Sequence, residues 1–136
     1  TEAEWEYACR AGSTTPHFTG DHLGRGYANY GTREPGVDLK PLKAGKALPN
    51  PWGFVDMPGG RFEWCSDILA EYPEGSVIDP TGPVLGVDEG VHINSRRVLR
   101  GATSDSSWEF VRSAARYGYK RRVNNGMRVV LEVEKP

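Results

Sequence analysis

The stretch PNPWGFVDMPGGRFEWCSD, residues 49–67, carries the strongest structural signals in the 136-residue chain. It holds two of the four tryptophans, Trp52 and Trp64. Prolines and glycines at 49–51 and 58–60 mark two turns, because both residue types set backbone angles that other residues resist. We therefore predict a shaped loop around which the rest of the chain is ordered.

Oxygen donors in this stretch are spaced for a hard cation. Asp56 and Glu63 lie on either side of a Pro-Gly-Gly turn. The turn can bring both carboxylates together with the main-chain carbonyls of Gly59 and Arg61, and Ca²⁺ prefers such a set of oxygens. Spacing alone leaves solvated turn carboxylates as the alternative.

The composition indicates one soluble globular domain spanning residues 1–136. Hydrophobic residues make up 38% of the chain and charged residues 26%, which is neither a disordered nor a membrane composition. No apolar run approaches the roughly 20 residues that span a bilayer, so we expect no membrane partner. The first residues do not have the form of a signal peptide, so a secretory signal is absent or lies upstream, and the compartment stays unknown.

The charge is distributed unevenly along the chain. Residues 1–90 hold seven basic and fourteen acidic side chains, whereas residues 91–136 hold ten basic and four acidic. We interpret this as attraction between two halves of one fold. No nucleic-acid-binding motif accompanies the basic half, so we expect no nucleic-acid partner. An anionic small ligand or a protein partner is the remaining interpretation.

Residues 1–12 are predicted to form a helix. Thr1 and Glu4 make an S/T-x-x-E capping box, and Gly12 is expected to end the helix. One face has apolar or small residues at helical spacing: Trp5, Ala8, Cys9 and Gly12. A helix capped by the first residue suggests a fragment or a processed product.

The remaining chain has few regular signals. Residues 13–48 and 68–94 are predicted to be mainly loops, because glycine, proline and asparagine dominate and no long apolar pattern appears. Three strands are predicted, at 97–101, 111–117 and 127–134. Cys9 and Cys65 lie far apart in apolar surroundings, which favours two buried thiols over a disulfide.

Familiar catalytic and metal motifs are absent from the sequence. The three histidines, His17, His22 and His92, share no metal-ligand spacing, and no nucleophile elbow, phosphate loop, dinucleotide fingerprint or EF-hand loop occurs. We therefore assign no catalytic residue.

Six motifs nevertheless occur in the order of one known family. They are TEAEWEYACRAG (1–12), PNPWGFVDM (49–57), GGRFEWCSD (59–67), RVLRG (97–101), VRSAAR (111–116) and GMRVV (126–130). Together they resemble the formylglycine-generating enzyme, or sulfatase-modifying factor, family nearly end to end. The resemblance implies an α+β fold with little regular secondary structure, related to C-type lectins, with calcium as a structural ion. It also implies that the family's N-terminal portion lies outside this sequence, upstream or on a companion chain.

The resemblance implies two calcium sites. Asp56, Glu63 and the carbonyls of Gly59 and Arg61 match one of them. Asn29 and Tyr30 resemble the start of a second site, with Asp38 as a later ligand.

One departure from the family bears directly on function. The oxidising members carry a copper-binding cysteine pair after an Arg-Gly-Gly-Ser-Trp-like motif, whereas here residues 100–108 read RGATSDSSW and no cysteine follows Cys65. A Cu(I) site needs thiolates. The sequence therefore predicts a copper-free domain that binds a ligand or a partner.

Two alternative functions stay open at this stage. In the first, the chain is part of an oxygen-dependent oxidoreductase, of the formylglycine-generating or non-haem iron sulfoxide-forming type, whose metal ligands lie elsewhere. Four residues would then line a pocket for an anion: Arg112, Arg116, Tyr117 and Arg128. In the second, the chain is a lectin-like variable display protein, diversified at about residues 102–125.

Overall fold

The computed structural model describes residues 1–31, 43–83, 87–88, 90, 92, 94–120 and 125–130, apart from the side chain of Arg25. Regular elements are short. They are the helix α1 (Glu2–Arg10), the 3-10 turns η1 (Arg25–Tyr27) and η2 (Trp108–Phe110), and the strands β1 (Glu63–Ile68), β2 (Arg97–Arg100), β3 (Tyr117–Tyr119) and β4 (Gly126–Met127). Within these described ranges no helix is long and apolar enough to cross a bilayer.

Helix α1 begins as the sequence predicts. The Thr1 side chain accepts a hydrogen bond from the Glu4 N–H at 3.2 Å, and the N-terminal amine donates to the Glu4 carboxylate at 2.7 Å. The predicted end is one residue late, because Ala11 takes the left-handed conformation (φ 46°) and donates its N–H to the Tyr7 carbonyl. Gly12 follows with φ +87°, so Ala11 and Gly12 together form the turn that ends the helix.

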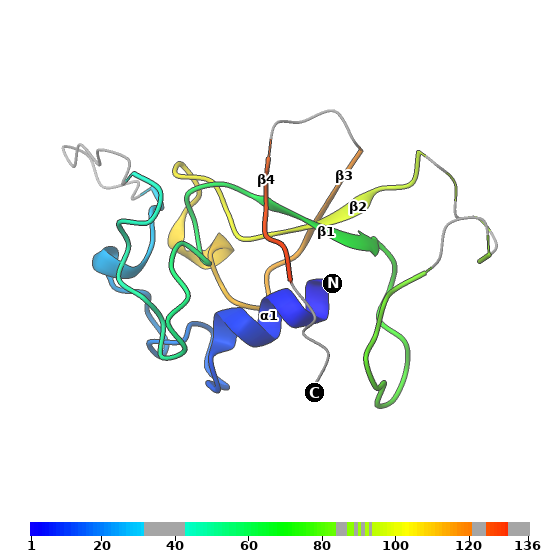
Figure 1. The fold of residues 1–136 in the computed structure, drawn as a ribbon, viewed down its shortest axis with the longest axis horizontal. Helices are drawn as coiled ribbons and strands as arrows, with labels where there is room; N and C mark the ends of the chain where they lie inside the picture. The colour runs from blue at the N-terminus through cyan, green and yellow to red at the C-terminus, as the bar shows by residue number, and fades with distance from the viewer. Residues whose placement is uncertain are drawn as a thin grey trace, which may run out of the picture.

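A four-stranded sheet in the order β3-β2-β1-β4 lies across α1 (Figure 1). β1 pairs antiparallel with β2 and parallel with β4, and β2 pairs antiparallel with β3. The register between β1 and β2 shifts between Trp64 and Ile68, which marks a bulge. β1 is therefore an inner strand, and it connects the sheet to the loop at 49–62.

Two sequence-based strand predictions need correction, and one strand was missed. Residues 111–116 form a turn after η2 rather than a strand, and β3 begins only at Tyr117. The strand predicted at 127–134 is limited to Gly126–Met127, with 128–130 irregular and 131–134 outside the described residues. The strand predicted at 97–101 is confirmed by β2, and the end of the 49–67 stretch is β1 rather than loop.

Two apolar clusters hold these elements together. The first joins α1, the loop before β1, and the sheet, through Trp5, Cys9, Met57, Cys65 and Val98. The second joins residues of the 13–31 loop region to the segment between β2 and β3, through Leu23, Ala28, Ala102 and Val111. The predicted loop character of residues 13–48 agrees with the described part of that range, where η1 is the single regular element.

His17 is a buried histidine in the loop region that follows α1. Its side chain is 1% exposed, and neither ring nitrogen makes a well-formed hydrogen bond with a described residue. Burial lowers the pKa of His17 below its ordinary value, and the backbone of Val111 opposes this only in part. The unfolded chain therefore binds a proton at a higher pH than the folded chain does.

We predict that this histidine makes the fold less stable in mild acid. As the pH falls below about 6.5, the unfolded state gains a proton that the folded state does not accept, so the free energy of unfolding decreases until the folded pKa is passed. Chemical unfolding at pH 7.5 and pH 5 should show a smaller pH effect in His17→Gln than in the wild type. The exposed His92 provides the control, because it is not among the groups that shift the pKa of His17, and His92→Gln should keep the wild-type pH dependence. Equal pH effects in wild type and His17→Gln would contradict the prediction.

Candidate functional site

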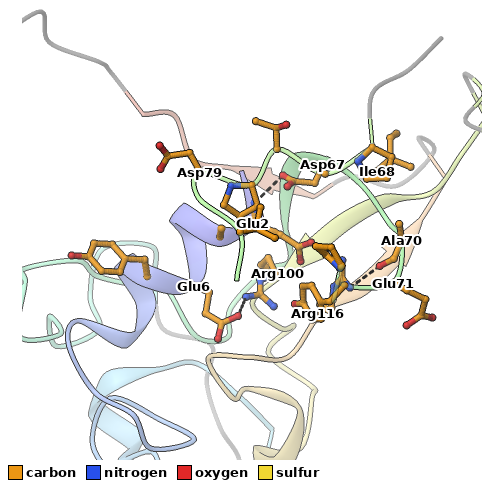
Figure 2. Close-up of a pocket in the computed structure, with 18 of the residues that line it drawn as sticks. Glu2, Glu6, Asp67, Ile68, Ala70, Glu71, Asp79, Arg100 and Arg116 are labelled. Atoms are coloured by element: carbon orange, nitrogen blue, oxygen red, sulfur yellow. Dashed lines mark hydrogen bonds and ion pairs between the residues drawn. The ribbon is translucent and has the colours of Figure 1, made fainter. Parts of the chain in front are cut away.

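A pocket of about 960 Å³ lies between α1 and the loop that follows β1 (Figure 2). We call it the α1 pocket. One wall is the outer face of α1, with Glu2, Glu6 and Arg10, and the other is the loop at 70–83. Arg100 from β2 and Arg116 from the segment before β3 complete its floor. The site thus draws on segments from both halves of the sequence.

Ion pairs organise this floor. Arg116 donates to the Glu2 carboxylate at 2.5 Å and to the Ala70 carbonyl at 2.9 Å. Arg100 pairs with Glu6 and also donates to the carbonyls of Ala114 and Ala115 at 3.1 and 3.0 Å. Glu6 pairs in addition with Arg10 at 2.8 Å, one helical turn away. These contacts attach α1 to the sheet through the floor of the pocket.

The acidic groups at the helix start are buried. Glu2 is 8% exposed and Asp67 is 2% exposed. Asp67 accepts the Glu2 backbone N–H at 2.8 Å, so a carboxylate stands at the positive end of α1. Burial raises the pKa of Glu2 above its ordinary value, although Arg116 and Arg100 oppose the shift.

The four residues predicted to bind an anion lie in three separate parts of the structure. Arg116 lines the α1 pocket. Arg112 and Tyr117 flank η2, where they donate to the carbonyls of Glu109 and Phe110 at 2.9 and 3.1 Å. Arg128 lies beyond β4, beside a second groove of about 1870 Å³. The structure therefore does not gather the four into one pocket.

The predicted calcium stretch has other partners for its carboxylates. Glu63 accepts two hydrogen bonds from Arg128, at 3.0 and 2.8 Å, and one from the Trp5 indole at 2.7 Å. Asp56 accepts the Gly45 N–H. Arg128 also donates to the Val55 carbonyl at 3.2 Å. As placed, the carboxylate oxygens of Asp56 and Glu63 do not form a calcium site that is ready to bind the ion. Glu63 would first have to release Arg128.

Segments of the two predicted calcium sites touch each other. Asn29 forms an isolated parallel bridge with Gly59, and its carbonyl accepts the Gly60 N–H at 2.6 Å. Tyr30 donates its hydroxyl to the Leu23 carbonyl at 2.6 Å. Asp38 lies outside the described residues. Within the described part of the chain, no group of three or more His, Cys, Asp or Glu side chains is placed to hold a metal.

Calcium binding remains a sequence-based prediction, and metal removal tests it. We expect excess chelator to lower the melting temperature, and added calcium to restore it, since an ion at 100 times its Kd stabilises a fold by about 2.7 kcal/mol. Asp56→Asn should abolish the calcium response, and Asp21→Asn, at an exposed loop position, should keep it. An unfolding curve unchanged by chelator would show that Arg128, rather than a cation, neutralises Glu63.

Both cysteines are free and buried, as the sequence predicts. Burial raises the pKa of the Cys9 thiol to about 11 and that of the Cys65 thiol to about 12. Cys9 lies 3.6 Å from the Ser113 hydroxyl, and both thiols belong to the core cluster under α1. At neutral pH both thiols are therefore protonated.

Most residues that line the α1 pocket are not among the site residues predicted from the sequence. Glu2 and Glu6 are four residues apart in the predicted helix, a spacing that places them on one helix face. Asp67 ends the 49–67 stretch, and Tyr72 falls in the predicted loop at 68–94. The spacing of the two glutamates is a usable sequence signal, whereas their pairing with Arg100 and Arg116 is seen only in the structure.

A sheet packed on one short helix, with long ordered loops and a charged pocket beside the helix, defines a low-regularity α+β domain. The sequence model of the sulfatase-modifying factor enzyme 1-like domain matches residues 1–133, and the chain belongs to this family.

Curated relatives include enzymes of this family and larger proteins. The chain is 34% identical over 134 residues to a formylglycine-generating enzyme of Streptomyces coelicolor, a match that covers 85% of the chain and 40% of the relative. It is 31% identical over 128 residues to the serine/threonine-protein kinase pkn1 of Chlamydia pneumoniae, covering 93% of the chain and 18% of the relative. The chain thus spans less than half the length of these relatives.

Solved structures support the fold assignment. PvdO from Pseudomonas aeruginosa is 26% identical with a TM-score of 0.65, and the match covers 92% of this chain and 47% of PvdO. Treponema denticola variable protein 1 is 30% identical with the same TM-score, and the match covers 88% of this chain and 41% of that protein. The predicted fold class is confirmed.

Proposed function

We propose that this chain is a copper-free domain of the sulfatase-modifying factor family that binds a ligand or a protein partner. The observation that carries the proposal is its cysteine content. Both cysteines are buried in the core, and none follows Cys65. Cu(I) sites require thiolate ligands, which this chain does not present to solvent.

The segment after β2 supports the same proposal. Ala102 is buried, and the Thr103 N–H donates to the Ser106 hydroxyl at 3.1 Å. The two hydroxyls of Thr103 and Ser106 also lie 2.9 Å apart, so they hold a turn together. Hydroxyls of this kind shape a loop but do not replace soft thiolate ligands.

The α1 pocket is the proposed binding site. It is concave, it brings together charged and apolar side chains, and its volume is in the range of pockets that take small molecules. Calcium at Asp56 and Glu63 would contribute stability to this scaffold, as the chelation experiment tests.

Copper binding and cysteine oxidation test the proposal directly. We expect no stoichiometric Cu(I) binding in an anaerobic titration, and no conversion of a cysteine-containing peptide to an aldehyde in the presence of copper and oxygen. The formylglycine-generating enzyme of Streptomyces coelicolor is the positive control. Stoichiometric Cu(I) binding together with aldehyde formation would overturn the proposal.

A second candidate function is recognition by a variable surface. The likeness to Treponema denticola variable protein 1 favours it. So do three exposed aromatic residues in the 102–125 segment, Trp108, Phe110 and Tyr119, which are 45%, 53% and 52% exposed. Sequencing the gene from many strains tests it, because diversified residues should cluster at 102–125. Uniform variation along the chain would remove this candidate.

A further inference from the structure

The lining of the α1 pocket has more carboxylates than guanidinium groups. Five acidic and three basic side chains line it: Glu2, Glu6, Asp67, Glu71, Asp79, Arg10, Arg100 and Arg116. Every one of these three arginines has an acidic partner within the pocket, either Glu2 or Glu6. The lining therefore has two more carboxylates than guanidinium groups, with Asp67 at the base beside the start of α1 and Glu71 and Asp79 on the exposed loop.

One buried oxygen in this pocket has no donor. Glu2 binds Arg116 through Oε1, whereas its Oε2 has no hydrogen-bond partner among the described residues. The residue is 8% exposed and lines the α1 pocket. Figure 2 shows Glu2 between the two arginines and Asp67, on the side of the helix that faces the pocket. A buried carboxylate oxygen in this state accepts a hydrogen bond from any donor that enters.

The opposite wall is apolar and uncovered. Tyr72, Val77 and Ile78 line the pocket and are 60%, 48% and 89% exposed. The Tyr72 ring centroid lies 4.2 Å from the Arg116 guanidinium carbon, so the ring already holds a cation against its face. The pocket therefore places an apolar wall opposite a carboxylate floor.

We infer that the α1 pocket binds a ligand with a positively charged nitrogen, an alkylammonium or guanidinium group, joined to an apolar portion. The nitrogen donates to Glu2 and lies near Asp67, Glu71 and Asp79, while the apolar portion packs on Tyr72, Val77 and Ile78. This inference rests on the proposed ligand-binding function and specifies its ligand class. The Nε atoms of Arg100 and Arg116 also have no described acceptor. Their guanidinium groups already make two or three other hydrogen bonds each, so they provide a weaker argument for an anion.

Three probes of similar size separate the alternatives. They are phenethylamine, which is charged at pH 7, the neutral phenethyl alcohol, and the carboxylate 3-phenylpropionate. In NMR titrations the amine should bind at least ten times more tightly than the alcohol, with shifts confined to α1 and residues 67–83. Its affinity should fall as salt is raised, because salt screens charge interactions near the surface. Equal or tighter binding of the carboxylate, or no binding of the amine, would overturn the inference.

Variants locate the interaction. The double variant Glu71→Gln/Asp79→Asn changes exposed loop residues, so it preserves the fold, and it should weaken amine binding at least threefold. Glu2→Gln should weaken it about tenfold, and circular dichroism checks that this variant is folded. Glu74→Gln is the matched control, because Glu74 lies in the same loop but does not line the pocket. Full affinity in the double variant would overturn the inference independently of Glu2.

A further titration distinguishes the two possible ligands, a small amine and a lysine side chain of a protein. A peptide with one lysine between two leucines, capped at both ends, carries the same ammonium chemistry as a protein side chain. Tighter binding of this peptide than of phenethylamine assigns the pocket to a basic segment of a protein, and the reverse order assigns it to a small amine. Both results support the inference. The copper and aldehyde assays are independent of these titrations, so failure of the amine with negative copper assays would remove the ligand class and leave the proposed function standing.

Discussion

Gly59→Ala should destabilise the fold by about 3 kcal/mol, because a side chain there is blocked by the backbone of a distant segment. A Cβ atom at Gly59 would lie 2.5 Å from the Asn29 carbonyl oxygen and 3.0 Å from its carbon. The backbone cannot move away easily, since the same carbonyl accepts the Gly60 N–H at 2.6 Å. Gly59 also has φ +80°, a conformation that alanine rarely adopts. Urea unfolding measures the loss.

The adjacent residue provides a matched control. Gly60 has nearly the same backbone angle, φ +81°, but a Cβ atom there would meet no described atom within 4 Å. Gly60→Ala should therefore destabilise the fold by only about 1 kcal/mol, the cost of placing alanine at a positive φ. The difference between the two variants measures the contact with Asn29. Equal losses would show that the bridge between residues 29 and 59 does not constrain the fold.

Replacing the buried Arg100 should have an effect of similar size. Arg100→Met keeps an unbranched apolar stem but removes the guanidinium group and its charge, and we expect a loss of about 3 kcal/mol. The side chain is fully buried, pairs with Glu6, and donates to the Ala114 and Ala115 carbonyls. Without it the buried Ala115 carbonyl loses its donor, and an unsatisfied buried group costs about 1–3 kcal/mol. Its guanidinium also lies 5.4 Å from the Trp5 ring centroid, a contact that methionine replaces only in part.

The variant Arg10→Met is the control that distinguishes the effect of burial from the effect of ion pairing. It binds the same Glu6 carboxylate at 2.8 Å, but its side chain is 26% exposed. Arg10→Met should cost less than about 1 kcal/mol, because ion pairs near the surface contribute little. A double-mutant cycle with Glu6→Gln then gives the coupling energy of each pair. Equal losses in the two arginine variants would contradict the assignment of Arg100 as a buried anchor.

The helix was predictable because its signals are local. The capping box, the acidic first turn and the apolar stripe all lie within twelve residues, and the structure reproduces them. β2 was predictable for a similar reason, since RVLR is short, partly apolar and followed by a glycine. Local chemistry decides these two elements without help from the rest of the chain.

β1 could not be identified from its own residues. Its inward positions include Glu63, Cys65 and Asp67, so charge rather than hydrophobicity marks the buried face. Those charges are neutralised by groups far away in sequence, Arg128 for Glu63 and the first turn of α1 for Asp67. An alternating apolar pattern therefore does not appear, and tertiary contacts override the local signal.

The candidate site was difficult to predict for the same reason. Arg112, Arg116 and Arg128 look equivalent in the sequence, yet only Arg116 reaches the α1 pocket. Its partners Glu2 and Ala70 are separated from it by 114 and 46 residues. The family motifs indicated that these positions matter, but contacts over such separations have no signature in a single sequence.

The parallel pairing of β1 with β4 has a consequence for how this protein is made. Glu63 and Arg128 are 65 residues apart, and a ribosome adds roughly 5–20 residues per second. The nascent chain therefore exposes a strand with an uncompensated carboxylate for roughly 3 to 13 seconds before its counter-ion exists. Stable docking of the sheet must wait until residue 128 has been synthesised, so this domain should fold after that point rather than progressively.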